Sequence, residues 1–375
     1  MRSNRALVWV AGVIGCGLAS GFGCGLDAVG SAVGATDPDA LAPDASSSDA
    51  PASDDGPDGA ALDAPVEAEC GDVQSAPSNC GRCGHSCLGG TCAAGKCQPV
   101  SLVTGDPGLG AVVVDATTAY YVAENSGVIR KVPIAGGASV DLFATGRAPH
   151  DLAFDGDRIF WTDQFGGGAA FLAGTSVKFS GGNGSARAVA TTTQGPYFIT
   201  ATSVDMWNRG LTAVIQSFTN NSSSPAIVTD ATYAYWSAGQ QIRRVLHTSS
   251  SVTNVVTGIG ANPTSMAISA THVYWTTATK VQRAPIGASA GWTIETLVST
   301  EIQAASIAVD GTHAYWMDLT TGALRRAPLA GGGAETLATF SAQLTDAAYP
   351  HQIALTPDAI CIASTSDGTL SRLAK

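Results

Sequence analysis

Residues 306–316 read SIAVDGTHAYW, and residues 265–275 read SMAISATHVYW. In each stretch a short apolar run precedes a tight turn, and a second run ends in Tyr-Trp. This pattern predicts a β-hairpin. The same signal recurs along the chain with its turn at seven positions, which are Asp115, Asp155, Ala201, Asp230, Ser269, Asp310 and Thr356.

The successive turns are 40, 46, 29, 39, 41 and 46 residues apart. A period near 40 residues that contains only strands is typical of a β-propeller blade. The sequence therefore predicts an all-β propeller over residues 98–375, and we favour seven blades over six. The interval of 29 residues leaves the third blade, residues 196 to about 224, too short for four strands, so we expect three strands there.

The two ends of the propeller domain complement each other. The last repeat, residues 350–375, stops after its third predicted strand. Residues 100–104 have the pattern of the missing outer strand. Pairing these segments would close the ring and protect edges that an open sheet exposes.

Each second predicted strand has a pair of large residues. The pairs are Tyr120-Tyr121, Phe160-Trp161, Met206-Trp207, Tyr235-Trp236, Tyr274-Trp275, Tyr315-Trp316 and Cys361-Ile362. Consecutive strand residues face opposite sides, so we expect both members to pack between blades, with Cys361 a buried free thiol. The stretches at 160–163, 274–277 and 315–318 resemble the repeats of the YWTD and NHL propeller families, which implies the fold but no particular activity.

The N-terminal 24 residues are typical of an export signal. Arg2 and Arg5 precede an apolar run that ends Val-Ile-Gly at residues 13–15, directly before Cys16. This ending resembles the lipobox of bacterial lipoproteins, which implies a lipid on Cys16. Plain secretion and a retained membrane anchor are the alternatives, and Cys24 is a second candidate processing site. We expect the protein in the cell envelope, as an outer-membrane lipoprotein, or secreted.

Residues 25–69 are predicted to be a disordered acidic linker. The segment 27–69 has nine Asp, two Glu and no Lys or Arg, which equals the net charge of −11 of the whole chain. Such a segment has too few apolar residues to offset the entropy of folding. Because the remainder is nearly neutral, we expect no nucleic-acid partner.

Residues 70–97 form a cysteine-rich module, and its cysteines are Cys70, Cys80, Cys83, Cys87, Cys92 and Cys97. An even number of cysteines in a short exported segment predicts three disulfides, with the pairing left open. The stretch 79–87 resembles a small Cys-rich module of Gram-negative surface proteins. A zinc site of Cys80, Cys83, His85 and Cys87 is the alternative. Covalent haem is excluded, because Gly84 separates Cys83 from His85.

The residue five positions before each turn is expected to begin the innermost strand, beside the mouth of the central channel. It is histidine in two repeats, at His150 and His351. The repeat between them contributes Gly110, whose missing side chain leaves room at the mouth. The loops after the second strands are expected to place further charged residues on this face, namely Glu124, Asp163, Arg209 and Asp318.

The candidate ligand-binding residues are therefore His150, Asp151, His351, Gln352, Asp163 and Asp318. Imidazoles beside carboxylates can hold a divalent metal or move a proton near neutral pH; we expect no other cofactor. A purely structural role for the two histidines is the alternative. The Pro-His phrases at 149–150 and 350–351 resemble one in streptogramin lyases, which implies seven blades and a histidine site with a divalent metal.

The sequence contains no nucleophile elbow, phosphate-binding loop or metalloprotease helix. We therefore favour a monomeric, non-enzymatic surface protein that presents a propeller face to an unknown protein or extracellular ligand. Membrane contact is expected only through the lipid anchor. An enzyme, a lyase or hydrolase acting at the channel mouth, is one alternative, and a scaffold in an envelope assembly is another.

Overall fold

The computed structural model describes residues 70–174, 177–180, 184–220, 226–287, 291–340 and 352–375. The predicted export signal, the predicted linker, Cys16 and His351 lie outside these ranges. The described residues belong to one compact unit. Within these ranges no helix has the length and hydropathy needed to cross a membrane; a 3-10 turn, η1 (Glu124–Ser126), interrupts the strands.

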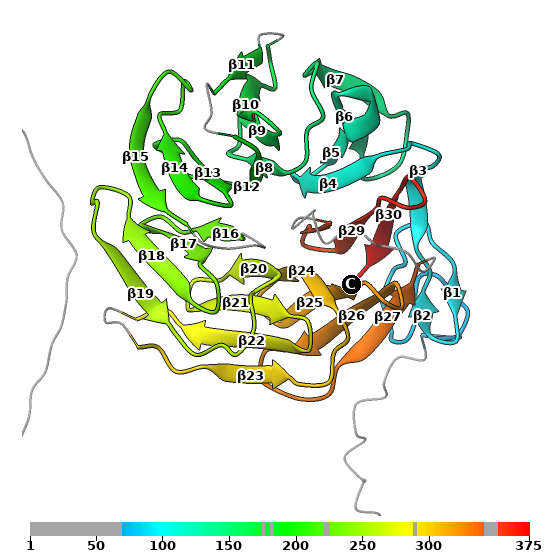
Figure 1. Cartoon of the computed structure of the whole chain (residues 1–375). Coiled ribbons are helices and arrows are strands. Elements are labelled where there is room, and N and C mark those ends of the chain that lie inside the picture. Colours follow the sequence, from blue (N-terminus) through cyan, green and yellow to red (C-terminus); the bar gives the residue numbers. More distant parts are fainter. Residues whose placement is uncertain (1–69, 175–176, 181–183, 221–225, 288–290, 341–351) are drawn as a thin grey trace, which may run out of the picture. The chain divides into compact units, whose positions relative to one another are not determined.

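Seven antiparallel sheets of four strands each form the blades of a β-propeller (Figure 1). From the innermost strand outward, blade 1 is β4 (Leu109–Val114), β5 (Thr118–Ala123), β6 (Val128–Pro133) and β7 (Val140–Ala144). Blade 2 is β8 (Leu152–Phe154), β9 (Arg158–Asp163), β10 (Gly166–Phe171) and β11 (Val177–Phe179). Blade 3 is β12 (Ala186–Thr191), β13 (Pro196–Thr200), β14 (Ser203–Trp207) and β15 (Val214–Thr219).

The remaining blades repeat this order. Blade 4 is β16 (Ile227–Thr229), β17 (Tyr233–Ser237), β18 (Ile242–Leu246) and β19 (Val252–Val256). Blade 5 is β20 (Ser265–Ile268), β21 (His272–Thr277), β22 (Lys280–Pro285) and β23 (Glu295–Val298). Blade 6 is β24 (Ala304–Val309), β25 (His313–Asp318), β26 (Ala323–Pro328) and β27 (Glu335–Thr339).

Blade 7 joins the two ends of the domain. Its strands are β28 (Ile353–Leu355), β29 (Ala359–Ser364), β30 (Thr369–Ala374) and β3 (Val100–Val103). β3 pairs antiparallel with β30, with Ser101 opposite Ser371. The innermost strand β28 contacts β4 of blade 1, so the ring is closed. The predicted seven blades and the predicted closure are both confirmed.

The large residues of the second strands form seven seams between blades. At each seam, the first residue of one blade's pair shares a hydrophobic cluster with the second residue of the next blade's pair. The partners are Tyr120 and Trp161, Phe160 and Phe198, Tyr197 and Trp236, Tyr235 and Trp275, Tyr274 and Trp316, Tyr315 and Ile362, and Cys361 and Tyr121. All are buried. Opposite faces of one strand thus supply the cores of two neighbouring seams.

The stretch predicted as blade 3 contains β13, β14 and β15, as expected, but β12 precedes it in the same sheet, so the prediction of a three-stranded blade is wrong. Its first turn begins at Thr192, whose N–H donates to Gly195 O at 3.0 Å, as Asp115 N–H donates to Thr118 O in blade 1 at 3.0 Å. Ala201 lies in the next turn, between the second and third strands. With Thr192 in place of Ala201, the turns are 40, 37, 38, 39, 41 and 46 residues apart.

The same shift corrects the aromatic pair of blade 3. The second strand β13 contains Tyr197-Phe198, five and six residues after Thr192. Met206-Trp207, the predicted pair, lies on the third strand β14. Pro196 lies five residues before Ala201, at the repeat position expected to begin the innermost strand, but it lies on the second strand, so this expectation is wrong for blade 3.

Cys361 is a free thiol and fully buried, as predicted. Burial raises the pKa of this thiol to about 12, although the charge of Arg372 acts in the opposite direction. The thiol is therefore protonated at neutral pH and a weak nucleophile.

The cysteine-rich module has a short hairpin, β1 (Cys92–Ala93) and β2 (Lys96–Cys97). Three disulfides join Cys70 to Cys83, Cys80 to Cys92 and Cys87 to Cys97. The predicted oxidation is confirmed. Cys80, Cys83 and Cys87 thus provide no thiolates for the alternative zinc site.

Candidate functional site

The seven first turns lie on one face of the propeller, which we call the turn face. The opposite face, where the innermost strands begin, is the mouth face. His150 lies at the mouth face just before β8, and its backbone N–H donates to Thr162 O at 2.9 Å. Its ring Nδ1 is 3.1 Å from Glu124 Oε1, which belongs to η1 of blade 1. Both side chains are partly exposed, so this pair is accessible to solvent at the seam of blades 1 and 2.

Asp151 and Gln352 are fully buried and link the innermost strands of neighbouring blades. Asp151 Oδ2 accepts a hydrogen bond from Val189 N–H of blade 3 at 2.9 Å. Gln352 Oε1 accepts a hydrogen bond from Ser306 Oγ of blade 6 at 3.4 Å, and the backbone N–H of Gln352 donates to the same hydroxyl oxygen at 3.4 Å. Ser265 Oγ accepts from Ile307 N–H in the same way. These contacts place both side chains within the wall of the ring rather than in its opening.

Asp163 and Asp318 end the second strands of blades 2 and 6 and are buried. Asp163 Oδ1 accepts from Phe165 N–H at 2.7 Å, and its Oδ2 is 3.3 Å from Arg147 Nη1. Asp318 Oδ1 accepts from Thr320 N–H at 2.9 Å. Both carboxylates therefore hold mouth-face loops in place.

Arg147 and two phenylalanines form a cluster that the sequence analysis missed. The guanidinium carbon of Arg147 is 5.1 Å from the ring centroid of Phe165 and 4.1 Å from that of Phe179. The exposed fractions of Phe165 and Phe179 are 53% and 36%. Gly168 allows β10 to approach Trp161, because a Cβ there would lie 2.2 Å from the indole. The one sequence signal for this cluster is Phe165 itself, an isolated aromatic residue beside three glycines.

Arg209 lies on the turn face, so its predicted mouth-face position is wrong. It follows the third strand of blade 3 and pairs with Asp155 of the blade 2 turn at 2.9 Å. The error follows from the shifted assignment of strands in blade 3. Glu124, in contrast, lies on the mouth face as expected.

Among the cavities of the described propeller, one lies near the centre of the ring and another near its rim. One, of about 220 Å³, is lined by innermost strands of blades 1 to 5 at the turn-face end of the channel, including Val113 and Phe154. Another, of about 540 Å³, lies beside η1 and is lined by Asp106, Tyr121 and Arg130. Asp106 Oδ2 accepts from Tyr121 Oη at 3.0 Å and from Arg130 Nη1 at 2.6 Å.

The described residues bring three potential metal ligands close together at one place only, the sulfurs of Cys80, Cys87 and Cys97. All three are disulfide-bonded. At the mouth face, His150 Nδ1 and Glu124 Oε1 are two potential ligand atoms that lie 3.1 Å apart. His351, the second histidine of the predicted site, lies outside the described residues.

Solved structures of low sequence identity share the fold. A catalytically inactive virginiamycin B lyase from Staphylococcus aureus with quinupristin has 14% identity and a TM-score of 0.58, covering 74% of this chain and 98% of that chain. A chain of the mitotic checkpoint complex has 11% identity and a TM-score of 0.60, covering 74% and 94%. The computationally designed Ika8 protein has 12% identity and a TM-score of 0.56, covering 73% and 98%.

No protein family and no curated protein matches the chain. At identities this low, the structural likeness shows the β-propeller fold alone. The resemblance to YWTD and NHL repeats stays a prediction at the level of family.

Proposed function

We propose that this chain is an exported binding protein that holds a protein partner on the mouth face of blades 1 and 2. The observation that supports it is the cluster of Phe165, Arg147 and Phe179 beside the His150–Glu124 pair. Aromatic residues, phenylalanine included, and arginine are enriched in protein interfaces, and arginine is among the residues that contribute most binding energy there. Both phenyl rings contact the Arg147 guanidinium, so they form one apolar patch, and its burial by a partner would be favourable.

The cluster is rigid before binding, which favours affinity. Asp163 fixes the loop that holds Phe165 and pairs with Arg147. Phe179 lies edge-on to the buried Trp161, with ring centroids 6.0 Å apart. A partner would therefore order few side chains when it binds. The fitting partner surface is an apolar side chain flanked by a carboxylate, which could pack on Phe165 and face Arg147.

The proposed location rests on the sequence. A lipid on Cys16 followed by the acidic segment 27–69 would tether the propeller to a membrane surface and hold it clear of that surface. We propose a monomer without a cofactor in this role.

Site-specific crosslinking tests the proposal. A photoreactive residue at Phe165 is expected to capture one defined protein from intact cells, and Arg147→Ala in the same chain is expected to abolish the adduct. The control places the photoreactive residue at Val140, which is equally exposed at 47% but lies at the turn-face end of β7. Equal capture from both positions would contradict a mouth-face site.

The alternative function is an enzyme acting at the channel mouth. The His150–Glu124 pair favours it, because a carboxylate beside an imidazole can support proton transfer. Quinupristin, present in the similar lyase structure, is a defined probe. Loss of quinupristin in the presence of the protein, abolished by the His150→Ala, His351→Ala double variant but not by Phe165→Ala, would favour the enzyme over the binding protein.

A further inference from the structure

The disulfide module and blades 6 and 7 line a solvent-accessible pocket of about 260 Å³, which we call the seam pocket. From the module, Arg82, His85 and Lys96 line it. From the propeller, Arg326, Glu335 and Lys375 line it. Since Lys375 Nζ is 3.0 Å from Asp310 Oδ2, a carboxylate of the turn face, the seam pocket lies away from the mouth face.

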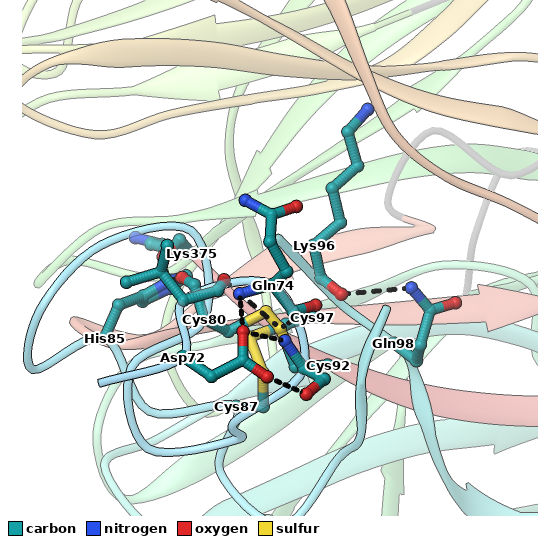
Figure 2. The surroundings of a disulfide bond; sticks show 12 residues. Asp72, Gln74, Cys80, His85, Cys87, Cys92, Lys96, Cys97, Gln98 and Lys375 are labelled. Atoms are coloured by element: carbon teal, nitrogen blue, oxygen red, sulfur yellow. Dashed lines mark hydrogen bonds between the residues drawn. A yellow bond between two sulfur atoms is a disulfide. The ribbon is translucent and has the colours of Figure 1, made fainter. Parts of the chain in front are cut away.

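Two side chains of the module hold the seam pocket together. His85 Nδ1 is 2.6 Å from Cys80 O within the module, and His85 Nε2 is 2.5 Å from Lys375 O of the propeller. Figure 2 shows His85 beside Lys375 and close to the disulfide-bonded cysteines. Lys96 Nζ donates to Thr336 O of blade 6 at 3.1 Å. The module is thus fixed against the propeller on both sides of the cavity.

The lining of the seam pocket has excess positive charge. Arg326 Nε pairs with Glu335 Oε1 at 2.6 Å, and Lys375 pairs with Asp310. Within the described ranges, no carboxylate pairs with Arg82 or Lys96. The ammonium of Lys96 contacts a neutral carbonyl, which leaves its charge uncompensated. Arg82 and Lys96 are therefore two cations of the lining that no side-chain carboxylate of the described residues compensates, whereas the carboxylates of Glu335 and Asp310 are already paired.

We propose that the seam pocket binds an oxyanion, specifically a phosphate or sulfate group. Arg82 offers a guanidinium fork, which matches the oxygens of such a group in pairs. The Lys96 ammonium holds it as a point charge, and Lys375, already paired with Asp310, offers its remaining N–H donors. The volume is below the range of about 300–1,000 Å³ typical of sites for larger ligands. It therefore suits one anionic group, either free or at the end of a longer molecule.

Binding an oxyanion would also join the module to the propeller. Arg82 and Lys96 belong to the module, whereas Arg326 and Lys375 belong to blades 6 and 7. A ligand that contacts both parts binds only the docked arrangement, so it stabilises that arrangement by mass action.

Calorimetric titration of the purified exported protein with inorganic phosphate tests the proposal, at constant ionic strength set with sodium chloride. We expect saturable binding at one site per chain. Arg82→Gln should weaken binding about tenfold or more, as expected for loss of charge-assisted hydrogen bonds. The matched control is Arg187→Gln, an exposed arginine of blade 3 that changes the net charge equally. It should leave phosphate binding unchanged.

Two competition experiments identify the source of the anion. Competition by glucose 6-phosphate would support a soluble phosphate ester, and competition by phosphatidylglycerol vesicles would support a lipid headgroup. Absence of phosphate binding beyond that seen with chloride would overturn the proposal. So would equal weakening by Arg82→Gln and Arg187→Gln, because that result indicates a diffuse charge effect.

Discussion

In blades 1, 4 and 6, the side chain of the turn aspartate organises the first hairpin of the blade. Asp310 Oδ1 accepts from the backbone N–H groups of Thr312 and His313, and its Oδ2 accepts from Tyr315 Oη at 2.9 Å and from Lys375 Nζ at 3.0 Å. Asp115 and Asp230 bond their own turn and the following tyrosine in the same way. Each of these aspartates therefore connects its turn to a seam between blades, because the tyrosine that it bonds packs in that seam.

These contacts set the charge state of Asp310. Burial alone raises the pKa of this carboxyl, but the hydrogen bonds from Thr312, His313, Lys375 and Tyr315 outweigh it, so the pKa lies well below its usual value. The pKa of Tyr315 is raised by burial and by its bond to Asp310. A folded pKa below the unfolded value of about 3.9 means that the carboxylate stabilises the fold above about pH 4.

Asp310→Ala is therefore expected to lower the free energy of unfolding by about 2 kcal/mol at pH 7. The difference from the parent should shrink as the pH falls below about 4, because the parent then loses the stabilising carboxylate. Urea unfolding at pH 7, 5 and 3 measures both effects. Asp358→Ala, at an exposed aspartate in the turn of blade 7, is the control and should cost less than about 0.5 kcal/mol. A difference that does not change with pH would argue against this role of Asp310.

At the scale of elements, blade 3 shows how two hairpins of one sheet can have the same local pattern. Thr192 Oγ1 accepts from Gln194 N–H at 3.1 Å and from Gly195 N–H at 3.2 Å in the first turn. Thr200 Oγ1 accepts from Thr202 N–H at 3.1 Å and from Ser203 N–H at 2.8 Å in the second turn. Both turns use a threonine hydroxyl, as Thr356 does in the first turn of blade 7, whereas the first turns of blades 1, 2, 4 and 6 use an aspartate. A local pattern thus identifies a hairpin but not its place in the blade.

Thr192→Ala is expected to destabilise the protein by about 1 kcal/mol, because two backbone N–H groups of the first turn lose their acceptor. The neighbouring Thr193 is exposed, and Thr193→Ala should change the free energy of unfolding by less than about 0.5 kcal/mol. Equilibrium urea unfolding compares the two variants. Equal stability would mean that the hydroxyl of Thr192 does not support this turn.

The whole molecule depends on the seam where the ring closes. Arg372 of β30 donates to Ile134 O of blade 1 and to Leu88 O of the module. Cys80, Cys87 and Cys97 share a hydrophobic cluster with Ile353 and Leu373 of blade 7. The module therefore covers the blade that is assembled from both ends of the domain.

Removing one disulfide of the module should accordingly weaken the propeller. The Cys87→Ala, Cys97→Ala variant lacks the disulfide that joins these two residues 10 positions apart. Its loss should lower the free energy of unfolding by about 2–3 kcal/mol and the Tm by about 5 °C. Residues 70–97 contain no tryptophan, so tryptophan fluorescence during heating reports on the propeller. An unchanged Tm by fluorescence would show that the module folds independently of ring closure.

The sequence by itself determined the propeller, its seven blades, its closure by residues 100–104 and the oxidised module. These features depend on repeated local patterns and on the number of cysteines. Both can be recognised in the sequence without knowing which residues are close in space. It also placed His150 and Glu124 on one face, because a position within a repeat fixes the end of the blade at which a residue lies.

Only the tertiary structure decided which residues meet. It paired the cysteines, placed Thr192 rather than Ala201 in the first turn of blade 3, and brought Arg147 between Phe165 and Phe179. It buried Asp151 and Gln352 between strands instead of exposing them at the channel mouth. The physical reason is that these contacts join segments from different blades, and their geometry depends on how neighbouring sheets pack, which no local pattern encodes.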